Sequence, residues 1–272
     1  MSALDTAPQL SRWRLIAEAP PGRTATGIVQ MVRRGDERLV LKIVTHQDEA
    51  SQPEVLAHFE GHGAVRLVEH DPPAMLLERA WPGTALSSLV TGRRDEEATA
   101  IVAEVIQRLH RAPAPAGFRT VEDLGLGFDR VRDQALAAGA DAALLDRAQR
   151  LYDELCASQG ERVLLHGDLH HDNILQDERR GWLAIDPKGV VGEGAYETGA
   201  MLRNPGPDPA LYADPRIIRR RCDQLAERRG YDPQRIIGWC FAQSVLSALW
   251  FIEDGLDPTL AWRTAQASRL VR

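Results

Sequence analysis

The pattern of apolar residues changes near residue 80, and this change constrains the fold more than any other feature of the sequence. Before it, Thr26 to Arg33 and Arg38 to Val44 are rich in Val, Ile and Leu and flank the turn sequence RGDE, which predicts a β-hairpin. Val65 to Glu69 and Met75 to Glu78 predict two further strands around the turn sequence DPP. The first 80 residues therefore predict a small β-rich lobe.

After residue 80 the apolar residues recur with helical spacing. Glu96 to Arg111 carries an apolar stripe with Asp95 as the expected N-cap, and Ala140 to Ala157 predicts a second helix. Asp232 and Gly255 enclose an apolar helix that we expect to form the buried core of this half. Together the two halves predict an α+β fold, with a small β-rich lobe over residues 1–80 and a larger, mainly helical lobe over residues 81–272.

Composition narrows the class of protein. The 272 residues include 33 basic and 39 acidic side chains, giving a net charge of −6, which disfavours a nucleic-acid partner and suits a neutral or cationic small molecule. The three cysteines form no CxxC pair. The longest apolar stretch, Ile236 to Ile252, is interrupted by polar residues, and the first residues lack a signal-peptide pattern. We expect a cytoplasmic protein without a membrane partner.

The segment VLLHGDLHHDNIL, Val163 to Leu175, places a cluster of polar side chains between two apolar runs. Such groups lie at a partly buried turn, where each needs a hydrogen-bond partner or a function. Asp168 and Asn173 belong to this cluster, and Asp186 follows at the end of the next apolar run, WLAI. Their carboxylate and amide oxygens suit a hard cation such as Mg²⁺.

Two other interpretations of this segment stay open. His166, His170 and His171 could bind zinc, since two of them are four residues apart, although the glycine between them argues against a helix. The Asp and Asn residues could also serve only as turn formers and caps.

The residues His166, Gly167 and Asp168, with Asn173 five positions later and Asp186 downstream, resemble the catalytic loop and metal-binding aspartate of the aminoglycoside phosphotransferases. The double histidine and the sequence IDPKG are similar to the streptomycin 6-phosphotransferase and hydroxyurea phosphotransferase branch of that family. The resemblance covers essentially the whole chain and implies a protein-kinase-like fold. It implies that Asp168 is the catalytic base, that Asn173 and Asp186 hold Mg²⁺, and that ATP is the phosphoryl donor.

Lys42 lies within the strand-like run VLKIV, where a buried charge is costly unless it is paired. The resemblance implies that Lys42 contacts the ATP phosphates, with Glu54 of a short helix from Pro53 to Glu60 as its ion-pair partner. Two alternatives remain. Lys42 could point to water from an edge strand, and Glu54 could form a capping box with Ser51.

The resemblance also implies further nucleotide-binding positions. Gly27 ends the segment GRTATG, which resembles a nucleotide-covering loop but lacks its full pattern and could be a plain turn. Glu78 and Ala80 fall at the expected hinge, where backbone groups would meet adenine. Lys188 could pair with a phosphate or with a local carboxylate.

Candidate substrate residues are acidic or aromatic. Glu253 and Asp254 end the apolar helix, where the helix dipole disfavours carboxylates, so they could form a docking site for a cation or could simply be screened by solvent. Glu193 and Trp250 are further candidates, whereas we expect Glu197 to pack against the catalytic loop.

These features predict an ATP- and Mg²⁺-dependent kinase that phosphorylates a hydroxyl of an aminoglycoside antibiotic, with streptomycin the best single candidate. The alternatives are a kinase of an ordinary metabolite such as a sugar or amino alcohol, a hydroxyurea kinase, and a nucleotide-binding regulator without catalysis. The intact set Lys42, Asp168, Asn173 and Asp186 argues against the regulator.

Overall fold

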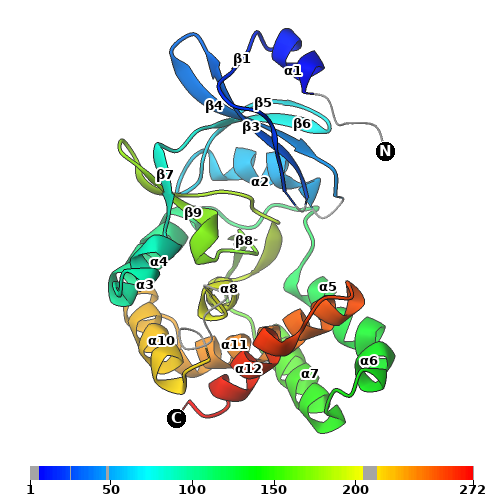
Figure 1. Cartoon of the computed structure of the whole chain (residues 1–272). Helices are drawn as coiled ribbons and strands as arrows, with labels where there is room; N and C mark the ends of the chain where they lie inside the picture. Colours follow the sequence, from blue (N-terminus) through cyan, green and yellow to red (C-terminus); the bar gives the residue numbers. More distant parts are fainter. Residues whose placement is uncertain (1–5, 25, 47–48, 205–212, 272) are drawn as a thin grey trace. The chain divides into compact units, whose positions relative to one another are not determined.

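The computed structural model describes residues 6–24, 26–46, 49–204 and 213–271. It divides into two compact units: unit 1 contains Met1–Thr84 and Leu175–Lys188, and unit 2 contains Ala85–Ile174 and Gly189–Arg272 (Figure 1). The stretch with Asp186 thus belongs to unit 1, which the change of pattern near residue 80 did not reveal.

Unit 1 is built on an antiparallel sheet with the strand order β1-β3-β4-β6-β5, and β2 pairs with β3. The strands are β1 (Ile16–Ala17), β2 (Gly22–Arg23), β3 (Gly27–Arg34), β4 (Glu37–Val44), β5 (Leu67–Asp71) and β6 (Ala74–Glu78). β3 to β6 confirm the four strands expected from the sequence. β1 and β2 are too short for an alternating pattern to reveal them.

The β3–β4 hairpin forms the centre of this sheet. Gly35 supplies the left-handed φ of +58° that the turn requires. One face of the sheet packs a core that includes Val32, Leu39 and Leu41 together with Trp13, which follows α1 (Ala7–Arg12). α2 (Gln52–Phe59) packs beside β5 and buries most of its apolar side chains (Figure 1). Unit 1 also holds β10 (Gly181–Ala184) and most of β7 (Pro82–Ala85) and β9 (Ile174–Asp177), which pair in the order β10-β9-β7.

Unit 2 is mainly helical. Its helices are α3 (Ser87–Thr91), α4 (Asp95–Leu109), α5 (Val121–Gly125), α6 (Gly127–Ala137), α7 (Ala142–Ala157), α8 (Thr198–Leu202), α10 (Pro215–Arg229), α11 (Pro233–Glu253) and α12 (Thr259–Ser268). An antiparallel pair, β8 (Arg162–Leu165) and β11 (Val190–Glu193), and two 3₁₀ segments, η2 (His171–Asn173) and η3 (Gly194–Glu197), complete it. α4, α7 and α11 confirm the three helices expected from the sequence.

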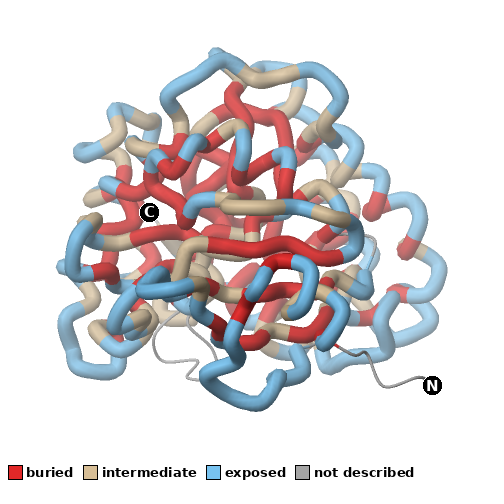
Figure 2. Tube along the Cα trace, turned by 90° about the horizontal axis from the view of Figure 1, so that it is seen from above, coloured by how far each residue is buried: buried red, intermediate tan, exposed pale blue. Residues whose placement is uncertain are grey.

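α11 is the core helix of unit 2. It begins at Pro233, as the sequence predicts, and Asp232 caps it by accepting a hydrogen bond of 2.9 Å from the backbone N–H of Gln234. α6, α7, α8, α10 and α12 all pack against it. By length and composition α11 could cross a membrane, but 72% of its most apolar window is buried inside the protein, as in a core helix. Figure 2 shows the buried segments in red and the exposed turns in pale blue.

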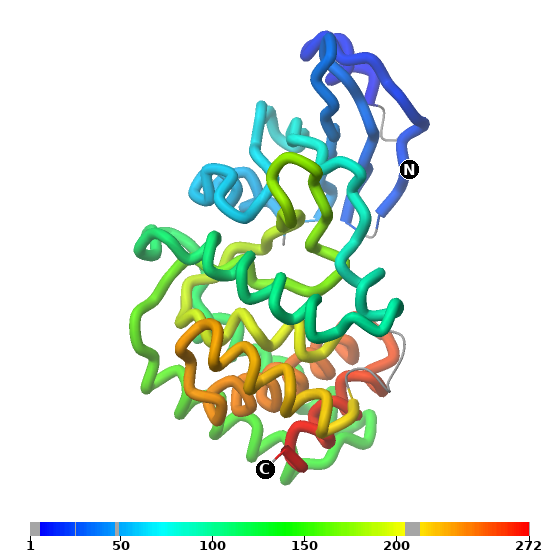
Figure 3. Tube along the Cα trace, turned by 90° about the vertical axis from the view of Figure 1, so that its left-hand side faces the viewer, coloured from blue at the N-terminus to red at the C-terminus, as the bar shows by residue number. Residues whose placement is uncertain are grey.

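The start of α4 corrects one expectation, because Asp95 is not its N-cap. The N-cap is the preceding residue, and the Asp95 carboxylate instead accepts hydrogen bonds from Arg221 Nε (3.1 Å) and Nη2 (2.7 Å) and pairs with Arg220. Arg221 is fully buried and also donates to the carbonyl oxygens of Met201 and Asn204. The pair joins α4 to α10, which run side by side in Figure 3.

Burial alone would raise the pKa of Asp95, but the hydrogen bond and charge of Arg221 outweigh burial and hold that pKa below its usual value. We expect Asp95→Ala to lower the free energy of unfolding by about 3–5 kcal/mol, because Arg221 is left buried without its counter-ion. The matched control is Asp223→Ala, which removes an exposed partner of Arg219 and should cost less than about 1 kcal/mol.

Urea titrations across pH measure both variants. Because the pKa of Asp95 is lowered by folding, its contribution is fully present above the unfolded pKa of about 4 and is lost as pH falls through the lower folded value. The difference between wild type and Asp95→Ala should therefore shrink in acid. Equal costs for the two variants at neutral pH would show that the buried pair contributes no more than an exposed one.

Candidate active site

The loop after β8 carries the polar cluster that stands out in the sequence. Gly167 adopts a φ of +83°, which turns the chain sharply after His166. The backbone N–H of Asp168 donates to His166 Nδ1 (3.3 Å), and the N–H of His170 donates to the Asp168 carbonyl (2.9 Å). The Asn173 side-chain amide donates to the same carbonyl at 2.9 Å. The loop therefore holds its own shape through hydrogen bonds among its polar residues.

Glu197 anchors this loop from η3. Its carboxylate is buried and accepts hydrogen bonds from the backbone N–H of His166 (2.6 Å) and of Gly167 (3.0 Å), and His110 Nε2 lies 3.3 Å away. This confirms the expectation that Glu197 packs against the loop. Burial by itself would raise the pKa of Glu197, but its bond and charge interaction with His110 and the loop contacts keep that pKa below the usual value. Glu197 is thus a buried carboxylate that fixes the backbone before Asp168.

The three histidines of the loop lie in different environments. His166 and His171 are fully buried, whereas His170 is half-buried. Burial lowers the pKa of His171 to about 3, so its ring is neutral. The loop is not helical before η2, so the four-residue spacing does not place His166 and His170 on one helix face. No group of three His, Cys, Asp or Glu side chains is arranged to hold a metal within the described part of the chain, and zinc gains no support.

The donor set fits a hard cation better. The side-chain nitrogen of Asn173 is committed to the Asp168 carbonyl, so its amide oxygen is the atom left to bind a ligand. Asn173 is half-buried in unit 2, and Asp186 presents a half-buried carboxylate in unit 1. Amide and carboxylate oxygens of this kind suit Mg²⁺.

Lys42 is the centre of a charged cluster in unit 1. Only 2% of Lys42 is exposed, and β4 lies between β3 and β6, so the alternative of an edge-strand lysine pointing to water is wrong. Lys42 Nζ lies 2.8 Å from Asp186 Oδ1 and 2.8 Å from Glu49 Oε2, and it donates to Gln52 Oε1 at 3.1 Å. The cluster joins the central strand β4 to the segment before α2, to the first residue of α2 and to the residues that follow β10.

The ion pair predicted between Lys42 and Glu54 is wrong, because Glu49 occupies that place and Glu54 is exposed. α2 begins at Gln52, and residues two apart on a helix lie about 200° apart around its axis. Gln52 faces Lys42, so Glu54 points away. The capping box is also wrong, since the Ser51 hydroxyl makes no cap and donates to the Lys188 carbonyl at 3.0 Å. Glu49 precedes the helix, so the helical pattern gave no sign of its role.

The other nucleotide-binding candidates lie in unit 1. A Cβ on Gly27 would clash with the carbonyl oxygen of Ile43 in β4, so the strand pairing itself requires glycine there. The Glu78 carboxylate pairs with Arg180, Ala80 is buried, and Lys188 is exposed. The presence of Gly27 and of Glu78 is thus explained by packing and by an ion pair within unit 1. A contact of nucleotide with the Ala80 backbone or with Lys188 stays a prediction.

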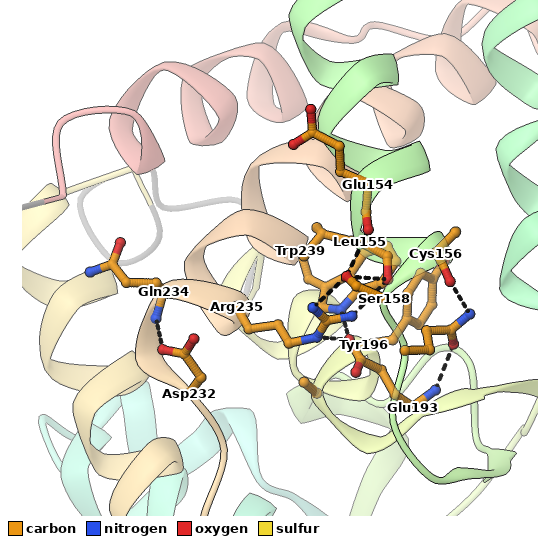
Figure 4. A network of polar contacts seen from close by, with 12 residues as sticks. Glu154, Leu155, Cys156, Ser158, Glu193, Tyr196, Asp232, Gln234, Arg235 and Trp239 are labelled. Carbon is orange, nitrogen blue, oxygen red and sulfur yellow. Dashed lines mark hydrogen bonds and ion pairs between the residues drawn. The ribbon is translucent and has the colours of Figure 1, made fainter.

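Glu193, a predicted substrate residue, is buried inside unit 2. Its carboxylate accepts hydrogen bonds from Arg235 Nε and Trp239 Nε1 (Figure 4). Arg235 also donates to the Leu155 carbonyl (2.6 Å) and to the Ser158 hydroxyl (3.0 Å). The sequence could not show that these partners, far apart in the chain, meet at the start of α11. The geometry assigns Glu193 to this structural network.

At the end of α11, one of the two carboxylates considered for cation docking has a partner within the protein. Glu253 forms a two-pronged ion pair with Arg130 of α6, with distances of 2.7 and 2.9 Å. The hydrogen bond from Arg130 lowers the pKa of Glu253, and it supplies the gain that offsets the unfavourable position of Glu253 in the helix dipole. Trp250 is half-buried against the core, and Asp254 is exposed with no side-chain partner in the described ranges.

We expect Glu197→Gln to lower the free energy of unfolding by about 2–3 kcal/mol, because an amide cannot accept from both backbone N–H groups as a carboxylate does. Amide hydrogen exchange at His166 and Gly167 should also become faster. Glu193→Gln is the matched control: it should destabilise the protein through Arg235 and Trp239 while exchange at the two loop amides changes no more than elsewhere. Selective protection of the loop in Glu197→Gln would contradict the anchoring role.

Known proteins resemble this chain along most of its length. A sequence model of the family described as aminoglycoside/hydroxyurea antibiotic resistance kinase matches residues 12–255. Streptomycin 6-kinase of Streptomyces glaucescens is 37% identical over 96% of this chain and 87% of its own length. Streptomycin 3''-kinase of Klebsiella pneumoniae is 32% identical over 90% of this chain and 92% of its own. Hydroxyurea phosphotransferase of Kitasatospora aureofaciens is 35% identical over 90% and 72%.

Solved structures show the same fold at low identity. A thermostable mutant of an aminoglycoside phosphotransferase, solved with ADP and hygromycin B, aligns with a TM-score of 0.68 at 15% identity and covers 98% of both chains. Plasmodium vivax ethanolamine kinase aligns with a TM-score of 0.64 at 13% identity, covering 98% of this chain and 84% of its own. The expected α+β, protein-kinase-like fold is confirmed, and the chain belongs to the family of aminoglycoside and hydroxyurea antibiotic resistance kinases.

Proposed function

We propose that this protein transfers the γ-phosphoryl group of ATP to a hydroxyl of streptomycin, with Mg²⁺ bound, in the cytoplasm. The observation that carries the proposal is the loop around Asp168, whose backbone is fixed by Glu197 and which lies in a chain matched along nearly its full length by streptomycin kinases. Three such relatives are 32–37% identical to it and cover at least 90% of it.

In the proposed reaction one P–O bond forms, one P–O bond breaks and one proton is transferred. The oxygen of the acceptor hydroxyl forms a bond to the γ-phosphorus, and the bond from that phosphorus to the β-phosphate oxygen breaks, leaving its electron pair on ADP. The hydroxyl proton passes to the Asp168 carboxylate. Such a reaction depends mainly on positioning and on compensating charge, so a rigid backbone around the base contributes directly to the rate.

The remaining charged residues would bind the nucleotide. In unit 1, Lys42 would contact the ATP phosphates while Asp186 and Glu49 hold its ammonium group. Asn173 and Asp186 would hold Mg²⁺, which when bound neutralises phosphate charge. The net charge of −6 favours the approach of a polycationic acceptor such as streptomycin. A neutral acceptor, hydroxyurea, is the second candidate, because a hydroxyurea phosphotransferase is 35% identical to this chain.

The first experiment measures Mg²⁺-dependent ADP release with streptomycin, other aminoglycosides, hydroxyurea and a set of sugars. We expect turnover with streptomycin, and we expect Asp168→Asn to lower kcat by about 10²–10⁴-fold because the base is removed. Binding of the ATP analogue AMP-PNP to Asp168→Asn should stay near the wild-type affinity, which separates loss of chemistry from loss of folding.

Three outcomes would change the proposal. Turnover with hydroxyurea or a sugar but not with streptomycin would keep the kinase and replace the acceptor. ATP binding without turnover on any acceptor would favour the regulator. Full activity of Asp168→Asn would overturn the assignment of the base.

The end of α11 supplies a matched pair of variants for the acceptor. Asp254 is exposed and has no side-chain partner among the described residues, whereas Glu253 is neutralised by Arg130. If the acceptor's cationic groups approach this helix end, Asp254→Asn should raise the KM for streptomycin about 3- to 10-fold, the effect of one exposed ion pair or slightly more. Glu253→Gln should change the KM less than about twofold, because its charge is already compensated. Equal KM values for wild type and Asp254→Asn would exclude this helix end from the acceptor site.

A further inference from the structure

Of the three histidines in the loop around Asp168, His170 is the one that is partly exposed, and no role has been assigned to it so far. His166 accepts a hydrogen bond from Asp168, and His171 is fully buried. His170 is half-buried, two residues after the proposed base.

The hydrogen bonds of the loop fix the proton of the His170 ring. His170 is the N-cap of η2, and its Nδ1 accepts a hydrogen bond of 3.2 Å from the backbone N–H of Asp172. An accepting Nδ1 carries no proton, so the neutral ring carries its proton on Nε2. Nε2–H is therefore a donor, and no residue of the described chain accepts a hydrogen bond from it.

The backbone of His170 forms hydrogen bonds with the backbone of Asp168 and of Asn173. Its N–H donates to the Asp168 carbonyl at 2.9 Å, and its carbonyl accepts from the Asn173 N–H at 3.0 Å. The ring is thus oriented by one hydrogen bond through Nδ1, and the backbone that carries it is fixed by two more, to the proposed base and to the proposed metal ligand. A donor held this firmly needs no reorganisation when charge develops beside it.

We propose that His170 donates its Nε2–H to an oxygen of the phosphoryl group in transit, and so acts as a further catalytic residue of the transfer. The inference rests on the proposed function. Phosphoryl oxygens are anionic acceptors, which suit an N–H donor. The cationic groups of a streptomycin-type acceptor offer only donors themselves and cannot accept from Nε2–H. His170 keeps its proton throughout, while the acceptor hydroxyl gives its own proton to Asp168.

Two amide variants distinguish the roles of the two ring nitrogens, because each reproduces only one of them. In His170→Asn the side-chain oxygen replaces Nδ1 and keeps the cap, but no donor reaches the position of Nε2. In His170→Gln the amide nitrogen replaces Nε2 as donor, but the cap is lost. We expect His170→Asn to keep the wild-type Tm and to lose about 100-fold in kcat, with the KM for ATP changed less than about threefold. We expect His170→Gln to lower the Tm and to retain kcat within about tenfold of wild type.

The more stable variant, His170→Asn, is thus expected to be the slower enzyme. If His170 had only a structural role, the more stable variant would be the faster one. If kcat falls in step with Tm across the two variants, or if His170→Asn keeps wild-type kcat, the catalytic role of His170 is overturned and the proposed function stands. If the wild type releases no ADP with any acceptor, the proposed function fails and this inference fails with it. Binding of Mg²⁺ and AMP-PNP, measured for all three proteins, shows whether a loss of kcat reflects lost nucleotide binding instead.

Discussion

The buried carboxylate of Glu197 is the contact on which the loop around Asp168 depends. A carboxylate can accept from two backbone N–H groups at once, and here it accepts from the two residues immediately before Asp168. Burying that charge costs free energy unless partners compensate it, and His110 and the loop amides do so. The same bonds that make the charge tolerable also remove freedom from the loop, so stability and positioning have one cause.

Buried charges with close partners recur elsewhere in both units. Lys42 is enclosed with Glu49, Gln52 and Asp186 in unit 1, and Arg221 with Asp95 in unit 2. A buried ion pair adds little net stability compared with apolar packing, yet breaking one is costly. Such pairs therefore specify geometry more than they stabilise. For Lys42 this means that its three partners hold the ammonium group at a fixed place beside the central strand β4.

Sequence reasoning recovered those parts of the fold that local patterns determine. Apolar runs and turn sequences gave β3 to β6, the helical pattern gave α4, α7 and α11, and the helix start at Asp232 and Pro233 was correctly expected. It failed where the partner lies far away in the chain. Asp95 satisfies the local rule for an N-cap but binds Arg221, and Glu253 breaks the helix-dipole rule because Arg130, more than 100 residues earlier, compensates it. Local rules cannot weigh tertiary partners.

The same limit explains why the reaction was easier to infer than the acceptor. The proposed base and the proposed metal ligands lie within a short stretch whose spacing is visible in the sequence. Acceptor recognition depends on scattered exposed groups, and two of the four candidates proved to be engaged inside unit 2, Glu193 by Arg235 and Glu253 by Arg130. Relatives named as 6-kinase and as 3''-kinase match this chain at 37% and 32% identity, so overall similarity does not separate the hydroxyl that is modified.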